Sequence, residues 1–93
     1  MKVYEILEAT KGILVSGNKE DDICFFSQDS RQMKNGGMYI PLKGERFDGH
    51  DFIDSAIKNG ANIILVEEIP EEKNQKVTYI KVKNSAKTLG QIA

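Results

Sequence analysis

One stretch of this 93-residue chain limits its fold more than any other. Residues 38–42 read as a short strand, and residues 50–59 carry apolar side chains at helical spacing. Residues 63–66 form an uninterrupted apolar run, which is typical of a strand covered on both faces. A strand, a helix and a second strand in this order predict a parallel pair joined by a right-handed crossover. The chain is therefore expected to be an α/β protein.

The remaining segments extend this unit into a small domain. Helical spacing predicts a helix over residues 3–10, and a further helix is expected to begin at Asn84. Residues 13–17, 23–27 and 77–82 read as strands. The expected architecture is a mixed or parallel sheet of about five short strands flanked by helices. Residues 1–83 would form this domain, and residues 84–93 would begin a helix that leads out of it.

Composition excludes several classes of function. The chain has 13 Lys and Arg against 14 Asp and Glu, so its net charge of -1 gives no electrostatic basis for binding nucleic acid or an anionic membrane. No apolar run approaches the ~18 residues of a membrane span, and the signal-peptide pattern is absent. Cys24 is the single cysteine and cannot form an internal disulfide. A cytoplasmic location is expected.

Two polar clusters flank the strand predicted at residues 38–42. Residues 28–31 follow one strand, and residues 42–52 lie between a strand end and a helix start. Ligands of open α/β sheets bind at such strand ends and helix N-termini. Arg31, Lys43 and Arg46 supply cations, and neighbouring glycines let a phosphate approach the backbone. The residues alone thus allow a phosphoryl-ligand site, or a solvated polar loop with local ion pairs.

These clusters resemble the N-terminal domain of the Mur ligases, which add the peptide stem to the cell-wall precursor UDP-N-acetylmuramic acid. The resemblance rests on the Asp-Ser-Arg turn at residues 29–31 and on residues 34–53, which contain a Lys-Gly loop before a Gly-His-Asp-Phe helix start. Gly37 departs from the pattern, because the family usually has Asp there. The resemblance covers nearly the whole chain and is densest over residues 29–66.

Within this family, residues 42–52 are most similar to the last ligase of the series, UDP-N-acetylmuramoyl-tripeptide–D-alanyl-D-alanine ligase (MurF). The preceding ligase, which adds the third residue, shares the Asp-Ser-Arg turn and is the alternative. The resemblance implies a cytoplasmic enzyme of peptidoglycan synthesis that forms an amide with ATP and Mg²⁺. Its partners would be UDP-N-acetylmuramoyl-tripeptide and D-alanyl-D-alanine. This part would hold the UDP moiety and would supply no catalytic residue, metal ligand or cofactor site.

The resemblance also implies a set of substrate-binding residues. Ser30 would hydrogen-bond the nucleotide or its diphosphate, and Arg31 would either contact the ligand or pair with Asp29 or Asp48. Asp48 reads as a helix cap, and His50 as a helix-start or pocket-wall residue without a partner for base catalysis. The full predicted set is Asp29, Ser30, Arg31, Lys43, Gly44, Glu45, Arg46, Asp48, Gly49 and His50.

One motif of the family is absent. Making an acyl phosphate from ATP needs a Gly-x-x-x-x-Gly-Lys-Ser/Thr loop, and the chain contains none. The family places that loop beyond the helix that begins at Asn84, and this helix stops in mid-pattern, so a longer protein is expected. Two further readings are a stand-alone α/β interaction domain and a small enzyme using His50 or Cys24. The second lacks any paired acid or base.

Overall fold

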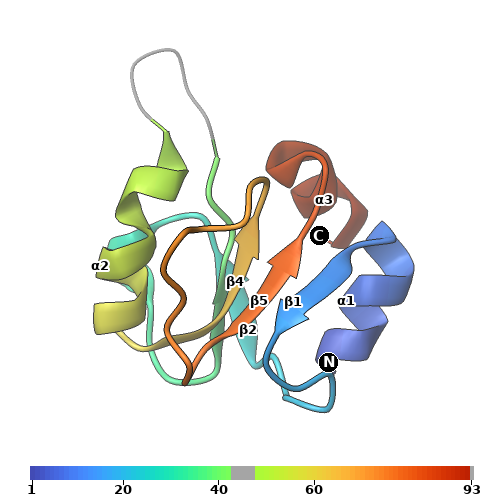
Figure 1. The fold of residues 1–93 in the computed structure, drawn as a ribbon, viewed down its shortest axis with the longest axis horizontal. Helices are drawn as coiled ribbons and strands as arrows, with labels where there is room; N and C mark the ends of the chain where they lie inside the picture. The colour runs from blue at the N-terminus through green and yellow to red at the C-terminus, as the bar shows by residue number, and fades with distance from the viewer. Residues whose placement is uncertain (43–47, 93) are drawn as a thin grey trace.

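The computed structural model describes residues 1–42 and 48–92 of the chain (Figure 1). In chain order, one helix precedes the first strand, one lies between the third and fourth strands, and one follows the fifth. In chain order the elements are α1 (Val3–Thr10), β1 (Ile13–Ser16), β2 (Phe25–Ser27), the 3₁₀ turn η1 (Ser30–Gln32), β3 (Gly37–Tyr39), the 3₁₀ turn η2 (Gly49–Phe52), α2 (Ile53–Lys58), β4 (Ala61–Val66), β5 (Thr78–Lys81) and α3 (Ser85–Ile92).

The strands form one mixed sheet. Its order is β1-β5-β4-β3-β2, so the strand that comes last in sequence lies inside the sheet. Strands β2, β3, β4 and β5 are parallel, whereas β1 runs antiparallel to β5. This arrangement confirms the predicted fold class, including the parallel pair β3 and β4 that is joined through α2.

Helices cover both faces of the sheet. Along β4 the side chains alternate: Ile63 and Leu65 belong to a core cluster with residues of α1, while Ile64 and Val66 belong to a cluster with Ala56 of α2. Figure 1 shows the same division, with α1 and α3 on one side and α2 on the other. Burial on both faces explains why residues 63–66 of β4 are uniformly apolar.

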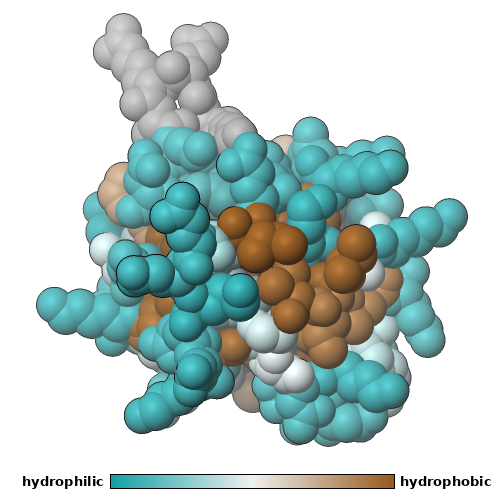
Figure 2. Space-filling model, in the orientation of Figure 1, coloured by the Kyte–Doolittle hydropathy of each residue, from teal (hydrophilic) through white to brown (hydrophobic). Residues whose placement is uncertain are grey.

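Part of one sheet face has no helix over it. Figure 2 shows an apolar patch over the region of β1 and β5, beside the polar side chains of the rest of the visible surface. Ile13 at the start of β1 is 62% exposed. The sheet is therefore covered unevenly, with α2 contacting β4 and leaving the β1 edge open.

Several predicted element bounds are wrong by a few residues, for local reasons. The strand expected at residues 23–27 begins only at Phe25, because the Ile23 N–H bonds the Met1 carbonyl instead of a neighbouring strand. The strand expected at residues 38–42 ends at Tyr39, shortly before Pro41, which has no N–H to donate. The helix expected from His50 begins with a 3₁₀ turn, and its α-helical part starts at Ile53.

Candidate functional site

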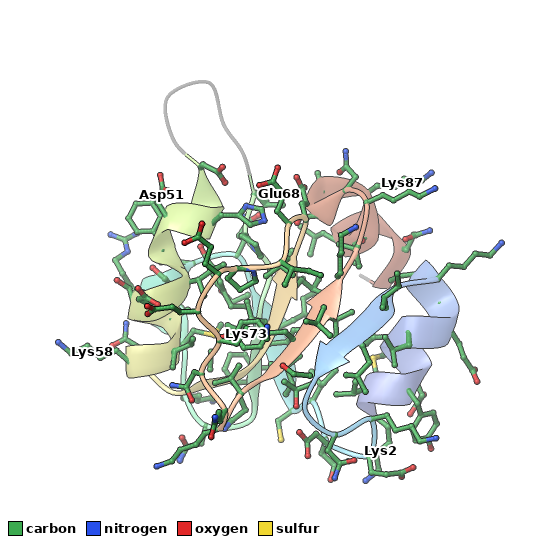
Figure 3. The ribbon with its side chains drawn as sticks, in the orientation of Figure 1. Lys2, Asp51, Lys58, Glu68, Lys73 and Lys87 are labelled. Atoms are coloured by element: carbon green, nitrogen blue, oxygen red, sulfur yellow. The ribbon has the colours of Figure 1, made fainter. Side chains whose placement is uncertain are left out.

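The parallel strands end at one edge of the sheet, and polar residues gather there. The turn η1 follows β2, the turn η2 follows the connection after β3, and a charged loop follows β4. Figure 3 shows Asp51, Glu68 and Lys87 along this edge, carried by η2, the loop after β4 and α3. This edge is where an open α/β sheet binds its ligands.

The turn at η1 is held by an ion pair between Asp29 and Arg31. Asp29 caps η1, since its Oδ1 accepts the Arg31 N–H at 2.9 Å. The same carboxylate accepts the Arg31 side chain in a fork, with Nε at 3.1 Å and Nη2 at 3.0 Å. The Arg31 guanidinium lowers the pKa of Asp29, and Asp29 in turn raises the pKa of Arg31. The pairing expected of Arg31 is therefore made with Asp29.

Ser30 connects this turn to the helix α2. The residue is only 8% exposed, and its carbonyl oxygen accepts a hydrogen bond from Asn59 Nδ2 at 2.9 Å. Asn59 is the C-cap of α2, so the bond joins positions 29 residues apart. The Asp-Ser-Arg turn is thus held twice, by the ion pair between its first and last residues and by the hydrogen bond from the end of α2 to its middle residue.

A surface cleft of about 630 Å³ opens between η1 and the helical segment η2–α2. Its wall combines an aromatic ring, hydroxyl and carboxamide groups and one ion pair. The lining residues are Gln28, Asp29, Ser30, Arg31, Tyr39, Phe52, Ser55 and Asn59. An apolar surface with a few convergent polar groups is the ordinary make-up of a small-molecule site.

Tyr39 forms the buried floor of this cleft. Its hydroxyl donates a hydrogen bond of 2.8 Å to the carbonyl oxygen of Gly49, and burial raises its pKa to about 12. Gly49 itself lies against the chain at Leu42, where an added Cβ would be 2.5 Å from the Leu42 nitrogen. Tyr39 therefore ties the end of β3 to the start of η2.

The second predicted cluster lies in a different hollow. Asp48 Oδ1 accepts the His50 N–H at 2.9 Å, which confirms the predicted cap, and lies 2.8 Å from His50 Nδ1. His50 Nε2 accepts the Glu67 N–H at 3.0 Å, so the ring proton is on Nδ1. Both ring nitrogens are therefore engaged, and Asp48 is a carboxylate partner of His50 that was not expected from the sequence.

The structure divides the predicted set of site residues. Asp29, Ser30 and Arg31 line the cleft, while Asp48 and His50 line a hollow of about 310 Å³ with Glu67 and the loop after β4. Gly49 does not line the cleft, but its carbonyl oxygen accepts a hydrogen bond from Tyr39, which does. Lys43, Gly44, Glu45 and Arg46 lie outside the described residues.

Five residues that line the cleft are not in the predicted set: Gln28, Tyr39, Phe52, Ser55 and Asn59. Asn59 reads as a helix end in the sequence, and Ser55 as an exposed helical position. Their only sequence signal is the spacing of residues 52, 55 and 59, which places them on one helical face. That spacing does not predict that η1 lies on the other side of the cleft.

Residues 1–42 and 48–92 contain no metal-binding cluster and no membrane-spanning helix. No group of three or more His, Cys, Asp and Glu in that part could hold a metal ion. None of the helices described is long and apolar enough to cross a bilayer.

Comparison with known proteins gives one consistent family. The family model described as "Mur ligase family, catalytic domain" matches residues 22–93. A UDP-N-acetylmuramoyl-L-alanyl-D-glutamate–2,6-diaminopimelate ligase of Bacteroides fragilis is 38% identical over 93 residues, which cover 100% of the chain and 19% of that relative. The ligase of the same name from Clostridium tetani is 40% identical over 91 residues, covering 96% of the chain and 19% of the relative.

The solved structures that match the chain are of another ligase, MurF. MurF from Acinetobacter baumannii matches with a TM-score of 0.85 and 27% identity, covering 98% of this chain and 20% of that one. The MurF ligase of Thermotoga maritima in complex with ADP matches with a TM-score of 0.63 and 34% identity, covering 75% and 16%. The chain spans about a fifth of the length of the curated relatives that it matches.

Proposed function

Since the chain belongs to the Mur ligase family, we propose that it is the part of such a ligase that holds the UDP end of a UDP-N-acetylmuramoyl-peptide. The cleft between η1 and α2 carries this proposal, because its preformed turn, aromatic ring and carboxamide suit a nucleotide. The whole protein would be an ATP-dependent amide-forming enzyme of peptidoglycan synthesis.

The relatives favour the third-residue ligase over the D-alanyl-D-alanine ligase expected from residues 42–52. The curated relatives at 38% and 40% identity are both named for adding 2,6-diaminopimelate to UDP-N-acetylmuramoyl-L-alanyl-D-glutamate. We therefore propose that dipeptide precursor as the substrate. The D-alanyl-D-alanine ligase remains the second candidate, supported by the structural match to MurF at a TM-score of 0.85.

The described residues would bind and orient the substrate. Arg31 would offer its exposed guanidinium edge to a phosphate, while its fork with Asp29 keeps the side chain in place. Ser30 would present backbone groups from a turn that Asn59 holds. A rigid turn loses little entropy when it binds, which favours affinity from few contacts. ATP and Mg²⁺ would bind elsewhere in the longer protein, since the chain has no phosphate-cradling glycine loop.

Titration of this chain with UDP tests the proposed site. We expect the amide NMR signals of Ser30 and Arg31 to shift at millimolar UDP, while signals of α1 stay in place. Unchanged signals at Ser30 and Arg31 would contradict the proposal.

Steady-state kinetics of the full-length ligase test the role of Arg31. Arg31→Ala should raise the KM for the UDP substrate about tenfold with little change for ATP, since one charge-assisted hydrogen bond contributes about 1.5 kcal/mol. Lys58→Ala is a matched control, because Lys58 is also an exposed cation but lies outside the cleft (Figure 3). A selective rise in the KM for ATP would contradict the assignment. Offering 2,6-diaminopimelate and D-alanyl-D-alanine side by side separates the two candidate ligases.

A further inference from the structure

A second hollow of the chain concentrates positive charge, although the net charge of the whole sequence is -1. It has a volume of about 390 Å³ and lies where the end of α1 and the start of β1 meet the end of β5 and the start of α3. None of the described residues that line it is acidic. Its lysines are Lys11, Lys81, Lys83 and Lys87.

We propose that this lysine hollow is a binding site for a small ligand that carries two or more linked phosphate groups. The lysine hollow shares no lining residue with the cleft between η1 and α2. The inference is therefore independent of the proposed function.

The backbone brings two of these lysines together. Lys81 pairs with Ile13 across β5 and β1, so the end of β5 lies beside the start of β1. Gly12 lies so close to β5 that an added Cβ would be 3.0 Å from the Lys81 carbonyl oxygen. Lys11 has a left-handed backbone with φ 56°, a conformation that glycine adopts more readily than lysine. This turn from α1 to β1 carries Lys11 to the end of β5.

The positive charge of the lysine hollow is not compensated within residues 1–42 and 48–92. Elsewhere Lys2 has its own carboxylate, since its Nζ lies 2.9 Å from Asp22 Oδ1. None of the four lysines of the hollow forms an ion pair in the part of the chain that the structure describes. Like charges around one hollow repel each other, and an anion placed between them replaces this repulsion by attraction.

The lysines supply this charge, and the helix ends do not. The start of α3 carries a partial positive charge and the end of α1 a partial negative one, so the two contributions oppose each other. The N–H of Ser85, the first residue of α3, already donates to Glu67 Oε2 at 2.8 Å. Glu67 lines the neighbouring hollow with His50 and does not line the lysine hollow. An anion would therefore be bound by side chains.

Asn84 adds a neutral donor whose direction is fixed. Its Oδ1 accepts the Lys87 N–H at 2.9 Å, which caps α3 and identifies the oxygen end of the carboxamide. Because the carboxamide is planar, this bond also sets the direction of Nδ2, which is an N–H donor. Gln91 lines the lysine hollow two turns further along α3 and brings a second carboxamide.

Charge and volume indicate the class of ligand. One phosphate group carries a charge of about −1.5 to −2 at neutral pH, which balances only about half of the four lysines. Linked phosphates match this charge better, and the hollow lies within the range of about 300–1,000 Å³ for small-molecule sites. Lysine binds phosphate as a point charge, whereas the arginine fork suits a planar carboxylate, and no arginine is among the described lining. The ligand is therefore an oligophosphate, either free or carried by a nucleoside.

Titration of this chain with sodium tripolyphosphate, followed by amide NMR, tests the inference. The amide signals of Lys81, Asn84 and Lys87 should shift. The signals of Ser30 and Arg31 report the other cleft, so binding at the two sites is measured separately in one titration. Lys87→Gln should weaken binding about fivefold, and Lys87→Arg should bind like the wild type. Asn84→Asp keeps a helix cap but places a carboxylate in the hollow, so it should weaken binding about tenfold or more.

Lys58→Gln is the matched control. It removes the same charge at the end of α2, far from Lys87 on α3 (Figure 3), and should bind tripolyphosphate like the wild type. If Lys87→Gln weakens binding no more than Lys58→Gln, or if no amide of residues 81–88 shifts, the inference is wrong. Sodium sulfate at the same ionic strength should bind about tenfold more weakly. Equal affinity for sulfate would show only general attraction of anions and would also overturn the inference.

The nucleoside triphosphate CTP distinguishes the two sources of the phosphate chain. If CTP and tripolyphosphate shift the signals of residues 81–88 with similar affinity, the phosphate chain is recognised whatever carries it, and the inference is supported. Binding of tripolyphosphate alone supports a free oligophosphate. Binding of CTP alone at these residues would mean that the nucleoside is recognised, which contradicts the inference. Failure of UDP to shift Ser30 and Arg31 would overturn the proposed function and leave the lysine hollow unaffected.

Discussion

Tyr39→Phe removes one oxygen atom and tests how the cleft is built. The Tyr39 hydroxyl is buried and donates at 2.8 Å to the Gly49 carbonyl oxygen, joining β3 to η2. Phenylalanine fills the same space, so no cavity forms and the core contacts of the ring persist. The change therefore isolates the hydrogen bond from the packing.

The expected cost follows from the carbonyl that is left behind. Leaving a buried acceptor without its partner costs about 1–3 kcal/mol, and loss of the hydroxyl's own desolvation offsets part of it, so we expect a loss of about 1.5 kcal/mol. For a domain of this length 1 kcal/mol corresponds to about 4–8 °C in Tm, which gives a decrease of about 6–12 °C. Urea denaturation should show a lower midpoint at an unchanged m-value.

Tyr4→Phe is the matched control. Tyr4 is 38% exposed and its hydroxyl makes no hydrogen bond within residues 1–42 and 48–92, so this variant should stay within about 0.5 kcal/mol of the wild type. If Tyr39→Phe is as stable as Tyr4→Phe, the hydrogen bond from Tyr39 to Gly49 contributes nothing to the free energy of unfolding, which would contradict this reasoning. A changed m-value would instead show that the variant altered more than this bond.

Three other measurements follow from the structure. Gly17→Ala should lower the free energy of unfolding by about 2 kcal/mol or more, because Gly17 has φ +102° and an added Cβ would overlap β5. Gly90→Ala should raise it by about 0.5–1 kcal/mol, because Gly90 lies inside α3 with open space around it. Thermal unfolding of both variants checks this. Arg31→Met should raise the pKa of Asp29 in a carboxyl NMR titration, because the ion pair lowers it; the contribution of that pair is present at neutral pH and disappears as the pH falls through this pKa. The folded-state pKa of about 12 for Tyr39 lies above its usual 10.0, so stability should fall as the pH rises from about 10 to 12, and this part of the loss should be missing in Tyr39→Phe.

The order of elements was predictable because the periodicities are strong and the breakers are well placed. The apolar run of β4 and the helical spacing of α1 need no tertiary information to be read. Element ends were less predictable, since long-range hydrogen bonds decide them. The Ile23 N–H donates a hydrogen bond to the Met1 carbonyl oxygen, and this partner cannot be predicted from residues 23–27 alone.

The candidate site was predictable only in its contiguous parts. The Asp-Ser-Arg turn is local, and its internal ion pair forms between residues two apart. The opposite wall depends on Asn59 meeting the Ser30 carbonyl across 29 residues, a contact created by the crossover from β3 to β4. The spacing of residues along the chain does not predict this long-range contact, so Ser55 and Asn59 were not predicted as site residues.

The placement of β5 inside the sheet has a consequence for the time course of folding. β1 pairs with β5, which places Ile13 opposite Lys81, and β5 also joins β1 to β4. A ribosome makes β1 before the other four strands of this sheet and β5 after them, so β1 waits with its edge unpaired until the rest of the sheet has been made. Pairings so distant in sequence slow folding and leave apolar edges open to association. We expect the last strand to be the step that closes the sheet, and nascent chains ending before it to depend on chaperones.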